Sequence, residues 1–554
     1  MFRFSVLPGL LLLALMTAGI AEEKNAAEKV AAEKIFRRGM SRSSRADYEG
    51  ALADFNRVIE TNPTMADAYY QRGIVYHNQN KMDLAIADYT KAIELDAKHA
   101  DAYATRGNAY YRLVDYKAAI ADYTKSIELS PANPIAWNRR GVGHETNNSL
   151  LTAINDYNQA IELDPKFGEA YVNRGDVRRK LGMLQAAIED YTKGIELDPT
   201  KANWFSTRGL AKGLAGDLEG SVADLTKAIT LDPNLAAAYE NRWTVLTRLG
   251  QADAAQKDYD QNLKLLPTNQ ATLQLLKDKL LPIYKQYPAP KTTSDFLTRG
   301  NAFYAAAYYY QAVADYRRAV EIDDFNADAF FDMGLAFGNL YSFEAAVEAF
   351  KKCVEVDDRY YKAFQELGEL YRYRLNLYDE AIKSQDQAIA LKPDYLIAWA
   401  SRGAAKKSKE DYPGAIQDLN KTIELDPNYA FGWSTRGETH FKMGNFDKAI
   451  ADLNKALELD PNGANSLVIR GNVKRAKKDY PGAIADFTAS LKLVNAAYTL
   501  MYRGLTYTEM GKTAEATADF EEAVKLIPSL KSELDQELAK LKTTSPTKAV
   551  KPSK

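Results

Sequence analysis

Small, aromatic and polar residues alternate along the chain at the spacing of amphipathic helices. In the stretch 100–129, Tyr103 and Gly107 lie on one helical face, and Ala119 and Tyr123 lie on another after a polar turn. This pattern predicts two helices of roughly a dozen residues each, joined by a tight turn. A Leu-Asp-Pro motif closes the second helix in several copies, because the residue before proline is disfavoured in the α conformation.

The predicted helix pair recurs with a period close to 34 residues. One position of the first helix aligns the copies with one another, because it is glycine in every copy except one, which has Trp243. The period fails once, between residues 266 and 296, with seven copies on each side. So regular a period indicates stacked units that share a continuous core. The glycines are Gly39, Gly73, Gly107, Gly141, Gly175, Gly209, Gly300, Gly334, Gly368, Gly403, Gly437, Gly471 and Gly504.

The repeat resembles the tetratricopeptide repeat (TPR). An aromatic residue fills position 4, as Tyr103 and Trp137 do, and alanine fills position 20, as in Ala119 and Ala153. Small residues allow close helix approach, and aromatic residues fill the space between units. The resemblance implies an all-α fold, a TPR solenoid in which antiparallel helix pairs stack into a right-handed superhelix with a concave groove.

The break and the two ends define the expected organisation. We expect two arrays of about seven repeats. In the break, residues 270–281 are expected to be helical, and Pro282, Pro288 and Pro290 are expected to prevent a further helix pair. A polar-faced helix after the second array is expected to cap the stack. The expected segments are a signal peptide (1–21), an N-terminal array (22–266), a degenerate helix with a Pro-rich link (267–295), a C-terminal array (296–528), a capping helix (529–542) and a disordered tail (543–554).

The N-terminus has the layout of a secretory signal peptide. Arg3 precedes an apolar run, and the small residues Gly19 and Ala21 follow it. We therefore expect cleavage after Ala21 and export, with a bacterial periplasm as the expected compartment and secretion or the ER lumen as alternatives. The other interpretation is an uncleaved anchor, although the apolar run is short against the roughly 20 residues that span a bilayer. No later segment has membrane length.

Composition narrows the possible functions. Lys plus Arg number 72 against 74 Asp plus Glu, so overall charge does not indicate a nucleic-acid partner. The single cysteine, Cys353, excludes an internal disulfide and falls on a small core position, which predicts a buried structural thiol. The four histidines lie in different repeats, and no phosphate loop or nucleophile motif occurs. We expect no enzyme activity, no cofactor and no metal site.

Position 7 of the repeat departs from the usual apolar residue of the family. It is Arg in twelve of the fourteen units, and each of those twelve has Asp sixteen residues later. The two units with Met333 and Leu367 lack the acid as well. Their joint loss predicts a structural ion pair between the two helices, with a ladder of binding arginines as the alternative. Examples are Arg72 with Asp88, Arg106 with Asp122, and Arg174 with Asp190.

The resemblance assigns the groove mainly to positions 2, 5, 9, 12 and 13 of each first helix. Position 12 or 13 is basic in four consecutive repeats of the second array, and this basic strip suits an acidic polypeptide or an anionic glycan. The alternative is a solvated face, in which Glu438 neutralises Lys442 on the same helix. The strip consists of Arg372, Lys407, Lys442 and Arg475, and further groove candidates are Arg179, Lys180, Asn108, Asn138, Asp176 and Asn301.

These observations favour a non-enzymatic scaffold that binds an extended segment or helix of a partner protein in the groove. Stacked repeats create a long surface for this purpose. The alternative is an adaptor that binds an anionic polysaccharide or cell-wall polymer through the basic strip. Salt distinguishes the two, because binding through several cations weakens steeply with ionic strength.

Overall fold

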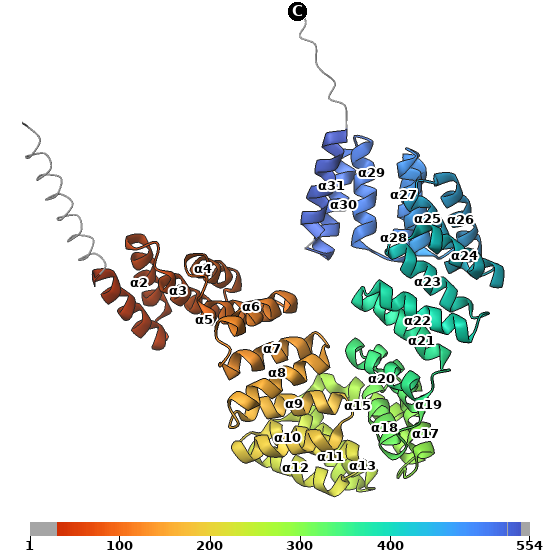
Figure 1. Cartoon of the computed structure of the whole chain (residues 1–554). Coiled ribbons are helices and arrows are strands. Elements are labelled where there is room, and N and C mark those ends of the chain that lie inside the picture. The colour runs from red at the N-terminus through yellow and green to blue at the C-terminus, as the bar shows by residue number, and fades with distance from the viewer. Residues whose placement is uncertain (1–29, 529, 545–554) are drawn as a thin grey trace, which may run out of the picture. The chain divides into compact units, whose positions relative to one another are not determined.

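The computed structural model describes residues 30–528 and 530–544, which are helices joined by short turns (Figure 1). The predicted all-α array of helix pairs is confirmed. The chain divides into two compact units, Met1–Ala349 and Phe350–Lys554, and the division falls within helix α20 (Phe343–Val356). The expected signal peptide and most of the expected tail lie outside the described residues. Among the described helices, none is long and apolar enough to cross a membrane.

The described residues of unit 1 form eight complete helix pairs, the break, and the start of a ninth pair whose second helix, α20, runs across the unit boundary. Its first described helix includes residues 30–44 and pairs with α2 (Tyr48–Thr61). The following pairs are α3 (Ala66–Asn78) with α4 (Met82–Leu95), α5 (Ala100–Arg112) with α6 (Tyr116–Leu129), α7 (Pro134–Thr146) with α8 (Leu150–Leu163), α9 (Gly168–Lys180) with α10 (Leu184–Leu197), α11 (Ala202–Ala215) with α12 (Leu218–Leu231), α13 (Ala236–Arg248) with α14 (Ala252–Leu265), α17 (Thr293–Ala305) with α18 (Tyr309–Ile322), and α19 (Ala327–Asn339) with α20.

Unit 2 continues the same architecture and ends in a single helix. Its last helix, α31 (Leu530–Thr544), buries Leu530 and Leu534 against α29, as a capping helix does. The pairs are α21 (Tyr361–Leu370, extended by a π-helical turn, Tyr371–Leu375) with α22 (Tyr378–Leu391), α23 (Leu396–Ser408) with α24 (Tyr412–Leu425), α25 (Ala430–Lys442) with α26 (Phe446–Leu459), α27 (Ala464–Ala476) with α28 (Tyr480–Leu493), and α29 (Ala497–Glu509) with α30 (Thr513–Leu526).

The recurring glycine allows the two helices of a pair to approach closely. A Cβ atom added at Gly107 would lie 2.8 Å from the ring of Tyr123, which is 2% exposed. A side chain at this position therefore cannot coexist with the aromatic ring in its present place. In the repeat that has Trp243 instead, the ring of Tyr259 packs edge-on against the indole, with centroids 5.6 Å apart. Cys353, at another small-residue position of the repeat, is fully buried, as predicted.

The break is more helical than its prolines suggested. After a 3₁₀ turn (Pro267–Asn269), α15 (Gln270–Leu275) runs through a π-helical turn (Leu276–Leu280) into α16 (Leu281–Gln286). The helix expected to end at residue 281 thus continues past Pro282 to Gln286. Proline lacks the N–H and crowds the carbonyl four residues earlier, and the wider π turn accommodates it, with the N–H of Leu281 bonded to the carbonyl of Leu276.

Candidate binding face of the C-terminal unit

The first helices of unit 2 form one continuous face. Each first helix packs against the next first helix, from α21 through α23, α25, α27 and α29 to α31. In the described part of unit 2, successive second helices do not pack against one another to this extent. The first helices are therefore closer together than the second helices, and they form the inner side of the local curvature. We call this surface the first-helix face.

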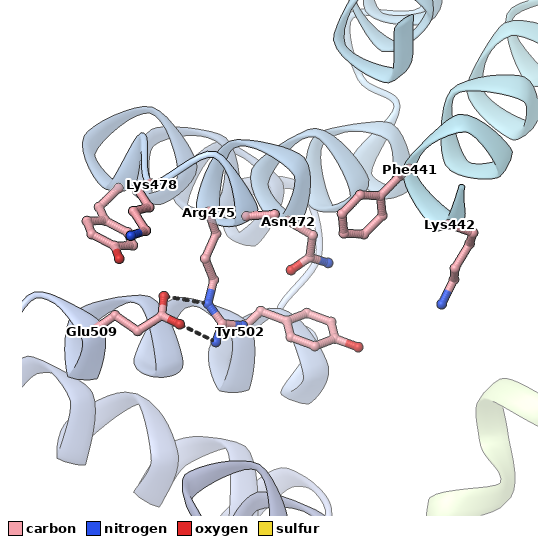
Figure 2. A pocket seen from close by; sticks show the side chains of 9 residues that line it. Phe441, Lys442, Asn472, Arg475, Lys478, Tyr502 and Glu509 are labelled. Atoms are coloured by element: carbon pink, nitrogen blue, oxygen red, sulfur yellow. Dashed lines mark hydrogen bonds and ion pairs between the residues drawn. The ribbon is translucent and has the colours of Figure 1, made fainter. Parts of the chain in front are cut away.

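The first-helix face carries the four residues of the basic strip, but three of them are paired within the protein. Arg475 of α27 donates from Nε and Nη2 to the carboxylate of Glu509 in α29, at 2.9 and 3.0 Å (Figure 2). Lys407 of α23 donates to Glu438 of α25. These contacts join neighbouring repeats, so the cations neutralise carboxylates of the same face.

Arg372 is held differently, within its own helix. Its Nη2 donates to Glu369 at 2.9 Å, and its guanidinium carbon lies 3.4 Å from the ring centroid of Tyr373. The side chain is 9% exposed, since the π-helical turn that ends α21 turns it into the protein. Arg372 is therefore a poor candidate for contact with a partner.

Lys442 is the exception in the strip. Its expected neighbour Glu438 is bonded to Lys407 of the preceding repeat, so the expected neutralisation of Lys442 by Glu438 is not what the structure shows. Within the described residues Lys442 has no hydrogen bond or ion pair, and it is exposed. It is the cation of the strip that remains available to a partner.

Lys442 borders an open pocket of about 470 Å³ between α25, α27 and α29. Figure 2 shows Phe441 next to Lys442 at one end, with Asn472, Arg475 and Tyr502 farther along, so aromatic rings, an amide and charges line one open pocket. The rings supply apolar contact area, and Asn472 supplies a donor and an acceptor. Such a combination suits an extended peptide with an apolar side chain close to an acidic one.

All twelve Arg–Asp pairs lie in contact in the structure. In each pair Nε and Nη2 donate to the two carboxylate oxygens, at distances between 2.5 and 3.0 Å. The carboxylates are buried, and Asp122 is 6% exposed. Both oxygens of the acid are satisfied by the planar guanidinium, which leaves these arginines engaged inside the repeat.

The sequence did not reveal a third bond of these arginines. In ten of the twelve, Nη1 donates to position 25 of the preceding repeat, which is usually Asn or Thr, and so ties two repeats together, whereas Nη1 of Arg299 donates to the carbonyl of Tyr287 in the break. The donor and acceptor pairs are Arg72 to Asn56, Arg106 to Thr90, Arg140 to Thr124, Arg174 to Asn158, Arg208 to Thr192, Arg242 to Thr226, Arg402 to Asp386, Arg436 to Asn420, Arg470 to Asn454, and Arg503 to Thr488.

The polar groove candidates of unit 1 serve the core. Asn108, Asp176 and Asn301, each at position 9, accept hydrogen bonds from the hydroxyl of the tyrosine at position 24 of the same repeat, at 2.7 to 2.9 Å. The amide oxygen of Asn138 accepts from Asn173 at 3.1 Å. Their acceptor oxygens therefore satisfy internal donors, and burial raises the pKa of tyrosines such as Tyr191 well above the ordinary value.

The two basic groove candidates of unit 1 are also paired. Lys180 donates to Glu145 of the preceding first helix at 2.7 Å. Arg179 lies between the hydroxyl of Tyr191 at 3.3 Å and the carboxylate of Asp176 at 3.5 Å. Both residues therefore lie on first helices, and both interact with other residues of unit 1.

The described residues contain no group of three or more His, Cys, Asp or Glu side chains suited to a metal ion. Cys353 is buried, away from solvent. The expected lack of enzyme activity and of cofactors stays a prediction.

Three sequence models of the repeat match the chain and together cover about half of it. Two are described as tetratricopeptide repeat and one as TPR repeat. The chain therefore belongs to the tetratricopeptide-repeat family. The first model matches residues 66–99, 100–133, 168–201 and 430–462, the second matches 327–360, 361–395 and 498–530, and the third matches 44–80 and 147–182. No curated protein matches the sequence significantly.

Solved structures with similar repeats include YrrB, described as a TPR protein with an unusual peptide-binding site. It is 28% identical over 33% of this chain and 95% of YrrB, with a TM-score of 0.30. MamA is 23% identical over 31% of this chain and 94% of MamA, with a TM-score of 0.29. The Cut9–Hcn1 structure is 15% identical over 89% of this chain and 96% of that chain, with a TM-score of 0.35. At such TM-scores these likenesses do not bear on what this chain binds.

Proposed function

We propose that the chain is a non-enzymatic protein-interaction scaffold that binds a segment of a partner protein on the first-helix face of unit 2. The observation that carries the proposal is the pocket beside Lys442, which combines Phe441, Tyr502 and Asn472 with a cation that has no internal partner among the described residues. An apolar side chain of the partner lies between the rings, and an acidic group meets Lys442. The proposed setting is an exported compartment, with the bacterial periplasm first.

The repeat architecture gives this face the rigidity that peptide binding needs. The ion pair of Arg475 with Glu509 connects α27 to α29, and that of Lys407 with Glu438 connects α23 to α25. A preorganised face loses little conformational freedom when the partner binds, which favours affinity. The ion pairs therefore support the site rather than form it.

The alternative, an anionic polysaccharide bound along the basic strip, has less support. Three of the four cations already neutralise carboxylates of the protein, so a polyanion would have to compete for them. Multivalent binding to anionic polymers needs several available cations, since each contributes only modestly near a solvated surface.

In-cell photo-crosslinking tests the proposal. A photoreactive residue replaces Lys442 on the first-helix face or, as control, Lys448, which is exposed on the second helix of the same repeat. We expect a discrete protein adduct from position 442, identified by mass spectrometry, and none from position 448. Capture of a glycan from position 442 would favour the polymer adaptor. Equal capture from both positions would contradict the proposal.

A further inference from the structure

The break in unit 1 forms a second pocket, which the proposed function does not use. The helix α15–α16 packs against the C-terminal end of α13 and leaves a pocket of about 700 Å³. Thr247, Arg248 and Gly250 line it from α13 and its turn, and Lys277, Leu281 and Lys285 line it from the break. The segment that interrupts the repeat therefore builds a site that a regular repeat would not have.

Arg248 lies between this pocket and the neighbouring cavity, without a carboxylate partner among the described residues. Its guanidinium carbon lies 4.0 Å from the ring centroid of Tyr284, and its Nη1 donates to the carbonyl of Gly213 at 2.8 Å. These contacts orient the guanidinium but leave its charge unneutralised. Among the described residues no acid lies within ion-pair distance of it, and burial lowers its pKa below the ordinary value for arginine.

The acids near Arg248 are engaged elsewhere. Asp315, which acts on it electrostatically, accepts two bonds from Arg299 at 2.6 and 2.7 Å. Glu240 lines the neighbouring cavity and accepts a bond from Asn269 at 2.7 Å. Arg242, on the same helix, forms an ion pair with Asp258 at 2.7 Å, so its charge is neutralised within the repeat. Arg248 lacks that counter-ion.

The remaining lining of the pocket adds charge and apolar area. Lys277 and Lys285 are exposed at its edge, and neither has an ion pair with any described residue. Leu218, Leu281, Pro282 and Pro288 supply apolar surface. No acidic side chain is among the described residues that line this pocket. Three cations thus line the same pocket as these apolar residues.

We propose that this pocket, which we call the break pocket, binds a ligand with one carboxylate at the end of an apolar chain. The carboxylate pairs with the guanidinium of Arg248, whose planar geometry suits two parallel hydrogen bonds, and the lysines attract the ligand from the edge. The apolar chain lies along Leu281 and the prolines. A fatty acid and the free C-terminus of a peptide that ends in an apolar residue share this chemistry.

Calorimetric titration of the purified chain tests the proposal with matched ligands. The first probe is decanoate, with decanol as its neutral control. The second probe is acetyl-Ala-Ala-Leu with a free C-terminal carboxylate, with the corresponding C-terminal amide as its neutral control. We expect at least one carboxylate to bind and its neutral counterpart to bind at least tenfold more weakly, and the probe that binds identifies the source. Binding of neither carboxylate, or equal binding of the neutral forms, would overturn the proposal.

Variants connect binding to the pocket. Arg248→Gln should lower the affinity at least tenfold, as expected for the loss of a hydrogen-bonded charge pair, and Arg248→Lys should retain part of it. The double variant Lys277→Gln with Lys285→Gln changes only exposed side chains, so it remains informative if Arg248→Gln fails to fold. It should weaken binding several-fold. Lys448→Gln, which changes an exposed side chain on the second helix α26 of unit 2, is the control and should change nothing. Unchanged affinity in the Arg248 and lysine variants would overturn the assignment, and this result is independent of the photo-crosslinking outcome.

Discussion

Arg106 donates two hydrogen bonds of 2.8 Å to the carboxylate of Asp122, from the first helix to the second helix of one repeat. Its third nitrogen donates to Thr90 of the preceding repeat at 3.0 Å. One side chain therefore joins three helices. The same arrangement recurs in nine other repeats, where the guanidinium group holds the helix pair together and ties it to the repeat before it.

Arg106→Met should destabilise the chain by about 3 kcal/mol, because the buried carboxylate of Asp122 is left without its counter-ion. The double variant with Asp122→Ala removes the stranded charge as well and should lose less. Chemical denaturation followed by circular dichroism measures the free energy of unfolding, and hydrogen exchange shows whether the loss is local to this repeat. Equal losses in the single and double variants would contradict a structural pair.

Gly107→Ala should destabilise by about 1 to 2 kcal/mol, since the added methyl would lie 2.8 Å from the ring of Tyr123. The matched control is Gly338→Ala in α19, where nothing lies within 4 Å of an added Cβ. There the better helix propensity of alanine should stabilise by about 0.5 to 1 kcal/mol. Thermal unfolding of both variants measures the difference, and changes of the same sign would contradict the packing argument.

Val114→Gly should stabilise the chain by about 1 kcal/mol, because a β-branched residue here adopts φ of +66° in the turn between α5 and α6. Three of the equivalent turns have glycine, Gly182, Gly250 and Gly444, with φ between +73° and +76°. The reverse change, Gly250→Val, meets no atom within 4 Å and should lose stability through backbone strain alone. A loss of stability in Val114→Gly, measured by thermal unfolding, would contradict this account.

We expect the carboxyl of Glu366 in α21 to make the stability of unit 2 depend on pH. Burial, assisted by the neighbouring Glu369, raises the pKa of its carboxyl from 4.5 to about 7. Because the folded-state pKa lies above the unfolded one, the carboxyl contributes most to stability below pH 4.5, and that contribution is lost as pH rises to about 7.

Glu366→Gln should therefore be more stable than the natural chain at about pH 8, by on the order of 1 to 2 kcal/mol after allowance for solvent screening. Near pH 4.5 the two chains should unfold at similar denaturant concentrations, because the carboxyl is then neutral. Denaturation at both pH values measures the difference. A constant difference across this pH range would mean that the carboxyl does not titrate there.

The helix pairs were predictable because a period of 34 residues repeats the same small and aromatic positions many times. The Arg–Asp relationship was visible for a related reason, since both residues are missing together in the repeats of Met333 and Leu367. Internal copies thus supply information on contacts that a single domain would not.

The partners of individual groove side chains were not predictable. Glu438 lies four residues from Lys442 but binds Lys407, which is 31 residues away, because adjacent first helices bring these two side chains together. Likewise, Asn108 was expected to face a partner, yet it accepts a bond from Tyr123. Which side chains pair depends on how far adjacent first helices are shifted along their axes relative to one another, and the repeat pattern does not specify this shift. The prediction that the helix ends before Pro282 was wrong for another reason, since the π-helical turn Leu276–Leu280 accommodates the proline and the helix continues.

Hydrogen exchange with mass spectrometry shows whether a partner binds the first-helix face of unit 2. The exchange of each helix is compared with and without the protein captured from position 442. We predict slower exchange in α25, α27 and α29, concentrated around Lys442, Asn472 and Tyr502, with α26 and α28 unchanged. Protection of α26 and α28, with none on the first helices, would contradict the account.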